Sequence, residues 1–143
     1  MTIGKRTSFI SLFLFSLVAC SPSSTTIDKK NDVIVKGVGT SNLDKFEQFV
    51  MNVDQGEVDK IRIVQYTLEG DPIFQTLEYS GNDIFYVSDN RKDKFAGKDK
   101  GLHKDSCKSI VKEQRESEST YRLIDCMNEA GRNGYDLVYV PKK

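Results

Sequence analysis

A chain of 143 residues suits a single domain once any targeting segment is removed. Lys and Arg together number 21, as do Asp and Glu, so no excess of positive charge indicates a nucleic-acid partner. Aromatic and β-branched residues recur from Val33 to Val140, which argues against a disordered chain. Cleavage of a leader that carries Lys5 and Arg6 would leave 19 basic against 21 acidic residues, a mildly acidic mature chain.

The first twenty residues have the composition of an export signal. Two basic residues, Lys5 and Arg6, precede an apolar stretch of roughly ten residues, too short to span a hydrocarbon core as a helix. The sequence LVAC at residues 17–20 follows, and it resembles the lipobox of bacterial lipoprotein signals. The alternative is an ordinary signal peptide with a chance Cys at its end.

The resemblance to a lipobox implies cleavage before Cys20 and a diacylglycerol on its sulfur, often with a further acyl chain on the new amino terminus. Two or three acyl chains give stable membrane anchoring, which one chain does not. We therefore expect a signal peptide at residues 1–19, lipidated Cys20 and a flexible polar tether over residues 20–32, and a single domain at residues 33–143. The tether would reach on the order of 20 Å. The expected location is the extracytoplasmic face of the cell membrane.

Two cysteines, Cys107 and Cys126, remain once Cys20 is assigned to lipid. An oxidising compartment allows them one intramolecular pairing. A redox-active pair normally has the spacing CxxC, and zinc would need more ligands than two Cys and one distant His. We therefore predict a structural disulfide and no metal site.

The segments around these cysteines predict a hairpin. Residues 106–112 and 121–127 have strand-like composition and flank a polar stretch suited to a loop. Placing one Cys opposite the other creates two further cross-strand pairs, an ion pair and an apolar pair. These pairs are Lys108 with Asp125 and Ile110 with Leu123.

One amphipathic helix is predicted near the start of the mature domain. Ser41 is a good N-cap with Asp44 three residues on, in a capping-box arrangement, and Gly56 supplies a stop. Apolar residues follow at helical spacing. They are Leu43, Phe46, Phe49, Val50 and Val53.

Period-two patterns predict antiparallel strands elsewhere. The predicted strands cover residues 33–38, 60–67, 73–80, 83–88, 106–112, 121–127 and 135–140. The sequence EGDP at residues 69–72 predicts a turn, Gly81-Asn82 a two-residue hairpin, and residues 89–105 a charged loop. The hairpin register pairs Leu77 with Tyr86 and Tyr79 with Ile84 on one face, and Thr76 with Val87 and Glu78 with Phe85 on the other. The predicted fold class is α+β, a roll-like domain in which one N-terminal amphipathic helix packs on an antiparallel β-meander held by one disulfide.

Four segments carry a family resemblance: NLDKFEQFV, DKIRIVQYT, EGDPIF and the two spaced cysteines. They resemble a domain-of-unknown-function family of small lipoproteins from spore-forming Gram-positive bacteria, from Val33 to about Met127. The shared motifs are a strand, a turn and a disulfide. The resemblance implies an envelope address and a fold, and it implies no activity.

Candidate chemical motifs favour structural roles. The glycines at residues 37–39 lack the third Gly and the parallel unit of a dinucleotide loop, and they predict a strand-to-helix turn. His103, the one histidine, falls in the Lys-rich loop, and the acidic residues fall in turns. The loop's basic residues exceed its acidic ones by six to four, which could touch anionic lipid or wall polymer. We predict no catalytic residues and no cofactor.

One helix covers only one face of the predicted sheet. We assign the helix stripe to the face of Leu77 and Tyr86. The opposite face is too apolar to be purely solvated, which indicates a candidate partner face. Its residues are Phe74, Thr76, Phe85 and Val87. The alternative is that the sheet curls, or that residues 135–140 fold over it, so that the aromatic side chains are core.

The expected function is a non-enzymatic binding or accessory module, held on the membrane by lipid on Cys20 and facing an envelope protein partner. Two alternatives stay open: a small inhibitor or immunity-type protein that acts on an extracellular enzyme, and an envelope hydrolase.

Overall fold

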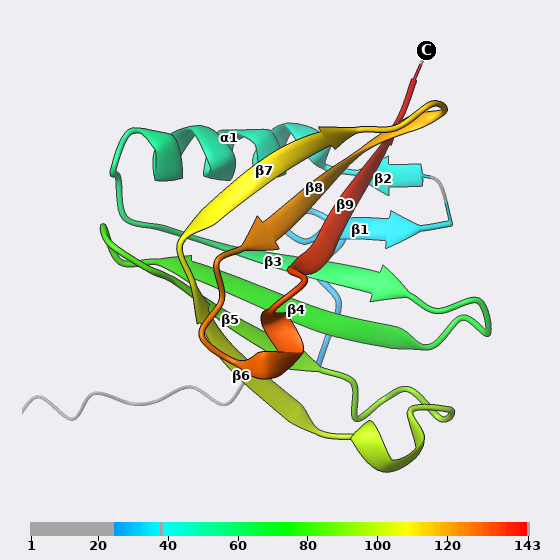
Figure 1. Ribbon diagram of the computed structural model, residues 1–143. Coiled ribbons are helices and arrows are strands. Elements are labelled where there is room, and N and C mark those ends of the chain that lie inside the picture. Colours follow the sequence, from blue (N-terminus) through cyan, green and yellow to red (C-terminus); the bar gives the residue numbers. More distant parts are fainter. Residues whose placement is uncertain (1–24, 38, 143) are drawn as a thin grey trace, which may run out of the picture.

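The computed structural model describes residues 25–37 and 39–142. Within them the chain forms two β-sheets and one α-helix (Figure 1). The elements are β1 (Val33–Lys36), β2 (Gly39–Ser41), α1 (Leu43–Asp54), β3 (Asp59–Tyr66), β4 (Pro72–Tyr79), β5 (Ile84–Asp89), the 3₁₀ turn η1 (Gly97–Asp99), β6 (Leu102–Cys107), β7 (Ser109–Gln114), β8 (Glu118–Ile124), the 3₁₀ turn η2 (Glu129–Gly131) and β9 (Tyr135–Pro141). The predicted signal peptide and Cys20 lie outside the described residues.

The larger sheet has six strands in the order β2-β1-β3-β4-β5-β6, and the smaller has three in the order β7-β8-β9. Neighbouring strands are antiparallel except β1 and β3, which pair in parallel, with Ile34 opposite Val64. Parallel neighbours need a crossover connection. The helix α1 lies in that connection, after the β1–β2 hairpin.

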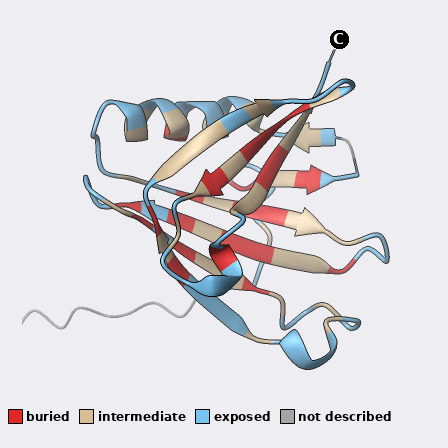
Figure 2. Cartoon of the chain, in the orientation of Figure 1, coloured by how far each residue is buried: buried red, intermediate tan, exposed pale blue. Residues whose placement is uncertain are grey.

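The core lies between the two sheets, with α1 closing one end (Figure 2). Leu77 and Ile84 of the large sheet and Leu123 and Leu137 of the small one are fully buried in a single cluster. Phe46 on α1 packs edge-on against Tyr121 of β8, with ring centroids 5.1 Å apart. The small sheet and α1 therefore pack against the same face of the large sheet.

The predicted fold class is wrong in three respects. The domain is mostly β, its helix follows a β-hairpin and is not N-terminal, and its strands form two sheets instead of one meander. The reason is area: a helix of twelve residues spans about 18 Å and cannot cover six strands. The face assigned to the helix, with Leu77 and Tyr86, also packs against the small sheet, where Tyr86 stacks on Tyr135 of β9.

The N-cap of the helix lies one residue later than predicted. Ser41 ends β2, and Asn42 occupies the N-cap position in a left-handed conformation, with φ 56° and no capping hydrogen bond from its side chain. The Asn42 side-chain amide instead donates to the backbone oxygens of Lys29 (3.1 Å) and Asp32 (2.7 Å). Its side chain is therefore used to hold the segment before β1.

The predicted register of the β4–β5 hairpin is confirmed. Leu77 pairs with Tyr86 and Glu78 with Phe85, around a turn closed by Ser80 N–H donating to Asp83 O at 3.1 Å. Gly81 at the tip has φ 95°, which a side chain would disfavour. The register places Leu77 and Tyr86 in the core and Phe85 on the opposite side.

The predicted loop over residues 89–105 is partly wrong, because its last four residues begin β6. The sequence LHKDSC has no apolar alternation, so its strand character is hidden. The side chains that alternate inward are Asp105 and Cys107, a carboxylate and a half-cystine. Period-two analysis misses a strand whose buried positions are polar.

The predicted disulfide between Cys107 and Cys126 is confirmed, and so is the pairing of Ile110 with Leu123. The two cysteines do not share one hairpin, however, because Cys107 ends β6 in the large sheet and β7 begins at Ser109 in the small one. The bond therefore ties the two sheets together.

The predicted ion pair of Lys108 with Asp125 is wrong. Lys108 lies where the chain passes between sheets, and its ammonium pairs with Asp83 in the β4–β5 turn. Asp125, just after β8, has φ 56° and is exposed. The left-handed residue Asp125 follows the last β7–β8 pair, Ser109 with Ile124.

Removing the disulfide should destabilise the domain. The bond joins two cysteines that are 19 residues apart in the sequence. Loss of a native bridge from a small secreted domain typically lowers the free energy of unfolding by about 2–5 kcal/mol. Urea unfolding of Cys107→Ser should show that loss, with Ser109→Ala as a control at a half-buried position nearby. Peptide mapping without reductant should recover the segments around Cys107 and Cys126 as one species; recovery of both as free thiols would contradict the bond.

Candidate functional site

The four residues of the predicted partner face lie on the side of the large sheet that faces away from the small sheet, here called the outer face. They do not share one environment. Phe74 on β4 is 2% exposed, Phe85 on β5 is 50% exposed, and Thr76 and Val87 are half-buried between them. Phe74 therefore leaves the candidate surface, which keeps the other three.

A depression of about 1060 Å³ opens on this outer face. It is lined by Thr76, Phe85 and Val87 of the sheet, and also by residues of α1 and of the segment before β1. The complete lining is Asn31, Asp32, Asp44, Lys45, Gln48, Asp59, Lys60, Ile61, Arg62, Thr76, Glu78, Phe85 and Val87. Apolar side chains among charged ones are the composition of a binding surface.

Residues 25–32, here called the strap, are bound to the domain beside this depression. Asp28 organises a turn in the strap: its backbone oxygen accepts from Asp32 N–H at 2.7 Å and its side chain from Lys30 N–H at 3.0 Å. On α1, the Lys45 ammonium donates to the backbone oxygen of Lys30 at 2.7 Å. Residues predicted to belong to the tether thus make specific contacts.

The strongest attachment of the strap is an ion pair with β3. Arg62 donates from Nε to Asp32 Oδ1 at 2.8 Å and from Nη2 to Asp32 Oδ2 at 2.7 Å, the two-point geometry that favours Arg over Lys. Nη2 also donates to the backbone oxygen of Thr26 at 2.7 Å. The hydrogen bonds to Asp32 raise the pKa of Arg62 above its ordinary value. The Asp32 side chain is only 5% exposed, so leaving it unpaired would be costly.

Arg62 also lies beside the buried ring of Phe74. Its guanidinium carbon lies 5.7 Å from the centre of the Phe74 ring, in cation–π range. The strap, the Arg62 side chain and the Phe74 ring thus lie close together at one end of the outer face. Farther along the same face, Phe85 stays open to solvent.

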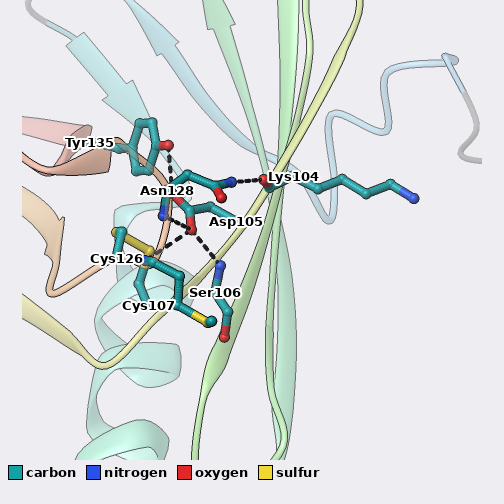
Figure 3. The surroundings of a disulfide bond; sticks show 8 residues. Lys104, Asp105, Ser106, Cys107, Cys126, Asn128 and Tyr135 are labelled. Atoms are coloured by element: carbon teal, nitrogen blue, oxygen red, sulfur yellow. Dashed lines mark hydrogen bonds between the residues drawn. A yellow bond between two sulfur atoms is a disulfide. The ribbon is translucent and has the colours of Figure 1, made fainter. Parts of the chain in front are cut away.

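A second cluster surrounds the disulfide, where the sheets meet (Figure 3). Asp105 Oδ1 accepts from the backbone N–H of Ser106 (2.8 Å), Met127 and Asn128 (both 3.1 Å), and Oδ2 accepts from the Tyr135 hydroxyl at 2.8 Å. One carboxylate of β6 therefore binds the segments that precede and begin β9. We call Asp105, Cys107, Cys126 and Tyr135 the junction.

The junction is tightly packed. A Cβ atom on Gly131 would lie 2.5 Å from Asp105 Oδ2 and 2.7 Å from Cys126 Cβ, so only glycine fits this part of η2. Tyr135 stacks on Tyr86 of β5 with ring centroids 4.5 Å apart. These contacts hold the small sheet against the large one.

The electrostatics of the junction favour a charged Asp105 beside neutral tyrosines. Burial alone would raise the pKa of Asp105, but the hydrogen bonds from Tyr135 and the three backbone N–H groups outweigh it, and the pKa is lowered. Burial raises the pKa of Tyr86 to about 12. Burial, and then the hydrogen bond to Asp105, raise the pKa of Tyr135 as well.

Asp105, Cys107 and Cys126 bring three potential metal-ligand atoms within 4.8 Å of one another. Metal coordination by cysteine requires a thiolate, and these two sulfurs are bonded to each other. In this oxidised form the group is a structural joint. Sequence reasoning missed the role of Asp105 because one Asp in a Lys-rich stretch carries no pattern.

The other sequence candidates have structural surroundings. His103 is exposed on β6, with Nε2 2.7 Å from the backbone oxygen of Asp99. Asp71, in the predicted turn, is buried and accepts from Lys94 N–H at 2.9 Å. Asp89 pairs with Arg91, whose hydrogen bond lowers the pKa of that carboxyl. The glycines at residues 37 and 39 belong to the β1–β2 hairpin.

The fold and these two clusters define a disulfide-linked, two-sheet β-domain. Residues 30–122 match the family model described as "Domain of unknown function (DUF4362)", and the chain belongs to that family. No curated protein and no solved structure matches it. In the part of the chain that the structure describes, no helix is long and apolar enough to cross a membrane.

Replacing Asp105 should change stability in a pH-dependent way. Its folded-state pKa lies below the ordinary 3.8, so its charge stabilises the fold above the unfolded-state pKa, and this is lost as the pH falls through the folded-state pKa. In Asp105→Asn an amide faces three N–H donors, and urea unfolding near neutral pH should show a loss of about 1–3 kcal/mol.

The difference between Asp105→Asn and the wild type should shrink as the pH falls below the ordinary 3.8 and through the lowered folded-state pKa of Asp105, because the wild-type carboxylate then becomes protonated. Asp99→Asn, an exposed acidic residue in η1, is the control and should follow the wild type. A loss that stays constant throughout this fall in pH would contradict the role of the Asp105 charge.

Proposed function

We propose that this protein is a lipid-anchored extracytoplasmic module, held on the membrane through Cys20, that acts by binding another component of the cell envelope and not by catalysis. The leader supports the address: basic residues, a short apolar stretch, and a Cys at the position of the lipid acceptor. The resemblance to small lipoproteins of spore-forming Gram-positive bacteria agrees with it.

The observation that carries the binding role is Phe85. Phe85 is 50% exposed, and it lines the depression from strand β5 and not from a loop tip. Exposed aromatic residues among polar side chains are typical of binding surfaces. The side chains of the junction, by contrast, bind one another and hold the two sheets together.

The anchor is tested by Cys20→Ala. The wild type, expressed in a bacterium with labelled fatty acid, should incorporate the label and be cleaved before residue 20. The variant should do neither, because the acceptor thiol is gone. Cys107→Ala is the matched control, since it removes a cysteine of the folded domain and should leave labelling intact. Equal labelling of Cys20→Ala and the wild type would remove the anchor from the proposal.

Two substitutions on the outer face test whether the Phe85 ring belongs to an exposed surface or to the core. Phe85→Ser should leave the melting temperature nearly unchanged, because the ring is half exposed. Phe74→Ser should cost about 3–5 kcal/mol, as other large-to-small core substitutions do. Thermal unfolding measures both. A large loss in Phe85→Ser would make this ring part of the core and would end its assignment to a binding surface.

A further inference from the structure

The strap determines where the anchor joins the domain. Arg62 on the outer face holds Asp32 and the backbone of Thr26, and Asn31 and Asp32 line the depression that contains Phe85. Figure 1 shows the strap behind the large sheet, on the side away from β7, β8 and β9. The described chain therefore begins on the outer face.

Little chain is left between that point and the lipid. Only Ser21 to Ser24 separate Cys20 from Thr25, and five residue steps span at most about 18 Å. With the strap bound, the outer face must lie close to the membrane surface. A tether free over all of residues 20–32 would impose no such orientation.

The outer face of β5 and β6 carries side chains suited to a lipid surface. Opposite Val87 on β5 is Lys104 on β6, and Leu102, two residues before it, is 46% exposed. Figure 3 shows the Lys104 side chain extended away from the junction. Among the described residues its ammonium has no carboxylate partner. Exposed apolar side chains beside a free Lys are typical of interfacial membrane contact.

The outer face of the small sheet has a different character. There Arg122 pairs with Glu113 at 3.0 Å and with Asp136 at 2.6 Å, so its central charge is neutralised by two carboxylates. None of the exposed large apolar side chains of the described chain belongs to β7, β8 or β9. Of the two outer faces, that of the large sheet is the better match to lipid.

We propose that the surface formed by Phe85, Leu102 and Lys104 rests on the anionic headgroup surface of the membrane that holds Cys20, with the strap as the device that orients it. This deepens the proposed function and rests on its lipid anchor. The component bound at the candidate surface is then the lipid surface, and a protein partner would engage the rest of the domain.

The absence of tryptophan from the sequence allows a direct test. The full chain, lipidated in a bacterium, is purified as Phe85→Trp and reconstituted in vesicles of equal parts phosphatidylcholine and phosphatidylglycerol, in which part of the phosphatidylcholine carries a nitroxide quencher on its headgroup. Its fluorescence should be quenched relative to vesicles without the nitroxide. Glu116→Trp, in the exposed β7–β8 loop, is the matched control and should lose no emission.

Two further arms isolate the cause. Lys104→Glu in the Phe85→Trp background should lose part of the quenching in anionic vesicles and be unchanged in pure phosphatidylcholine. Arg62→Ala should release the strap and weaken quenching at Phe85→Trp while the protein still floats with the vesicles.

Vesicle flotation separates the two levels of the proposal. A chain that does not float has no lipid anchor, and the proposed function fails. A chain that floats but leaves Phe85→Trp unquenched overturns the membrane contact alone. Equal quenching of Phe85→Trp and Glu116→Trp also overturns it, because the domain then has no preferred orientation. Cross-linking of this face to a protein in native membranes, without quenching, would assign the surface to that protein.

Discussion

The two-sheet arrangement depends on one short stretch of chain, where β6 ends in the large sheet and β7 begins in the small one. Asp105 and Cys107 lie on successive inward positions of β6, and each binds the segment after β8, one by hydrogen bonds and the other by a covalent bond. With the small sheet fixed there, Tyr135 reaches Tyr86 and the core residues of both sheets meet. At the far edge, β2 and β9 are joined by the Thr40 hydroxyl donating to the Tyr139 backbone oxygen at 2.9 Å.

Local pairings were predictable because neighbouring residues encode them. The register around Gly81-Asn82 and the pairing of Ile110 with Leu123 follow from turn type and side-chain complementarity, and the cysteine pairing follows from counting. Longer-range features were not. No sequence pattern near Val33 indicates that β1 pairs in parallel with β3. The inward positions of β6 are polar, so the period-two pattern indicates neither this strand nor the burial of Asp105. The split between β6 and β7 depends on tertiary packing, which period-two patterns do not contain.

The candidate surface was predictable in part for the same reason. Alternation along the β4–β5 hairpin places Thr76, Phe85 and Val87 on one face, and the structure keeps them there. Alternation could not reveal that Phe74 would be buried. The ring lies beside Arg62, which binds a strap thirty residues earlier in the chain. A polar segment such as SPSSTTIDKKND has no periodic signal, yet its Asp28 organises a turn and its Asp32 binds Arg62 of the domain.

The place where the strap meets the fold also has a mechanical consequence. Tension applied through a lipid anchor would enter the domain first at Arg62, on β3, which has hydrogen-bonded neighbours on both sides. Beyond Asp32 it would pass into β1, another interior strand, and not into the edge strand β2. Such a load acts across several strands at once. The domain therefore resists it better than a pull that peels strands from an edge one at a time. The same ion pair that orients the domain would thus protect it against being unravelled from its membrane end.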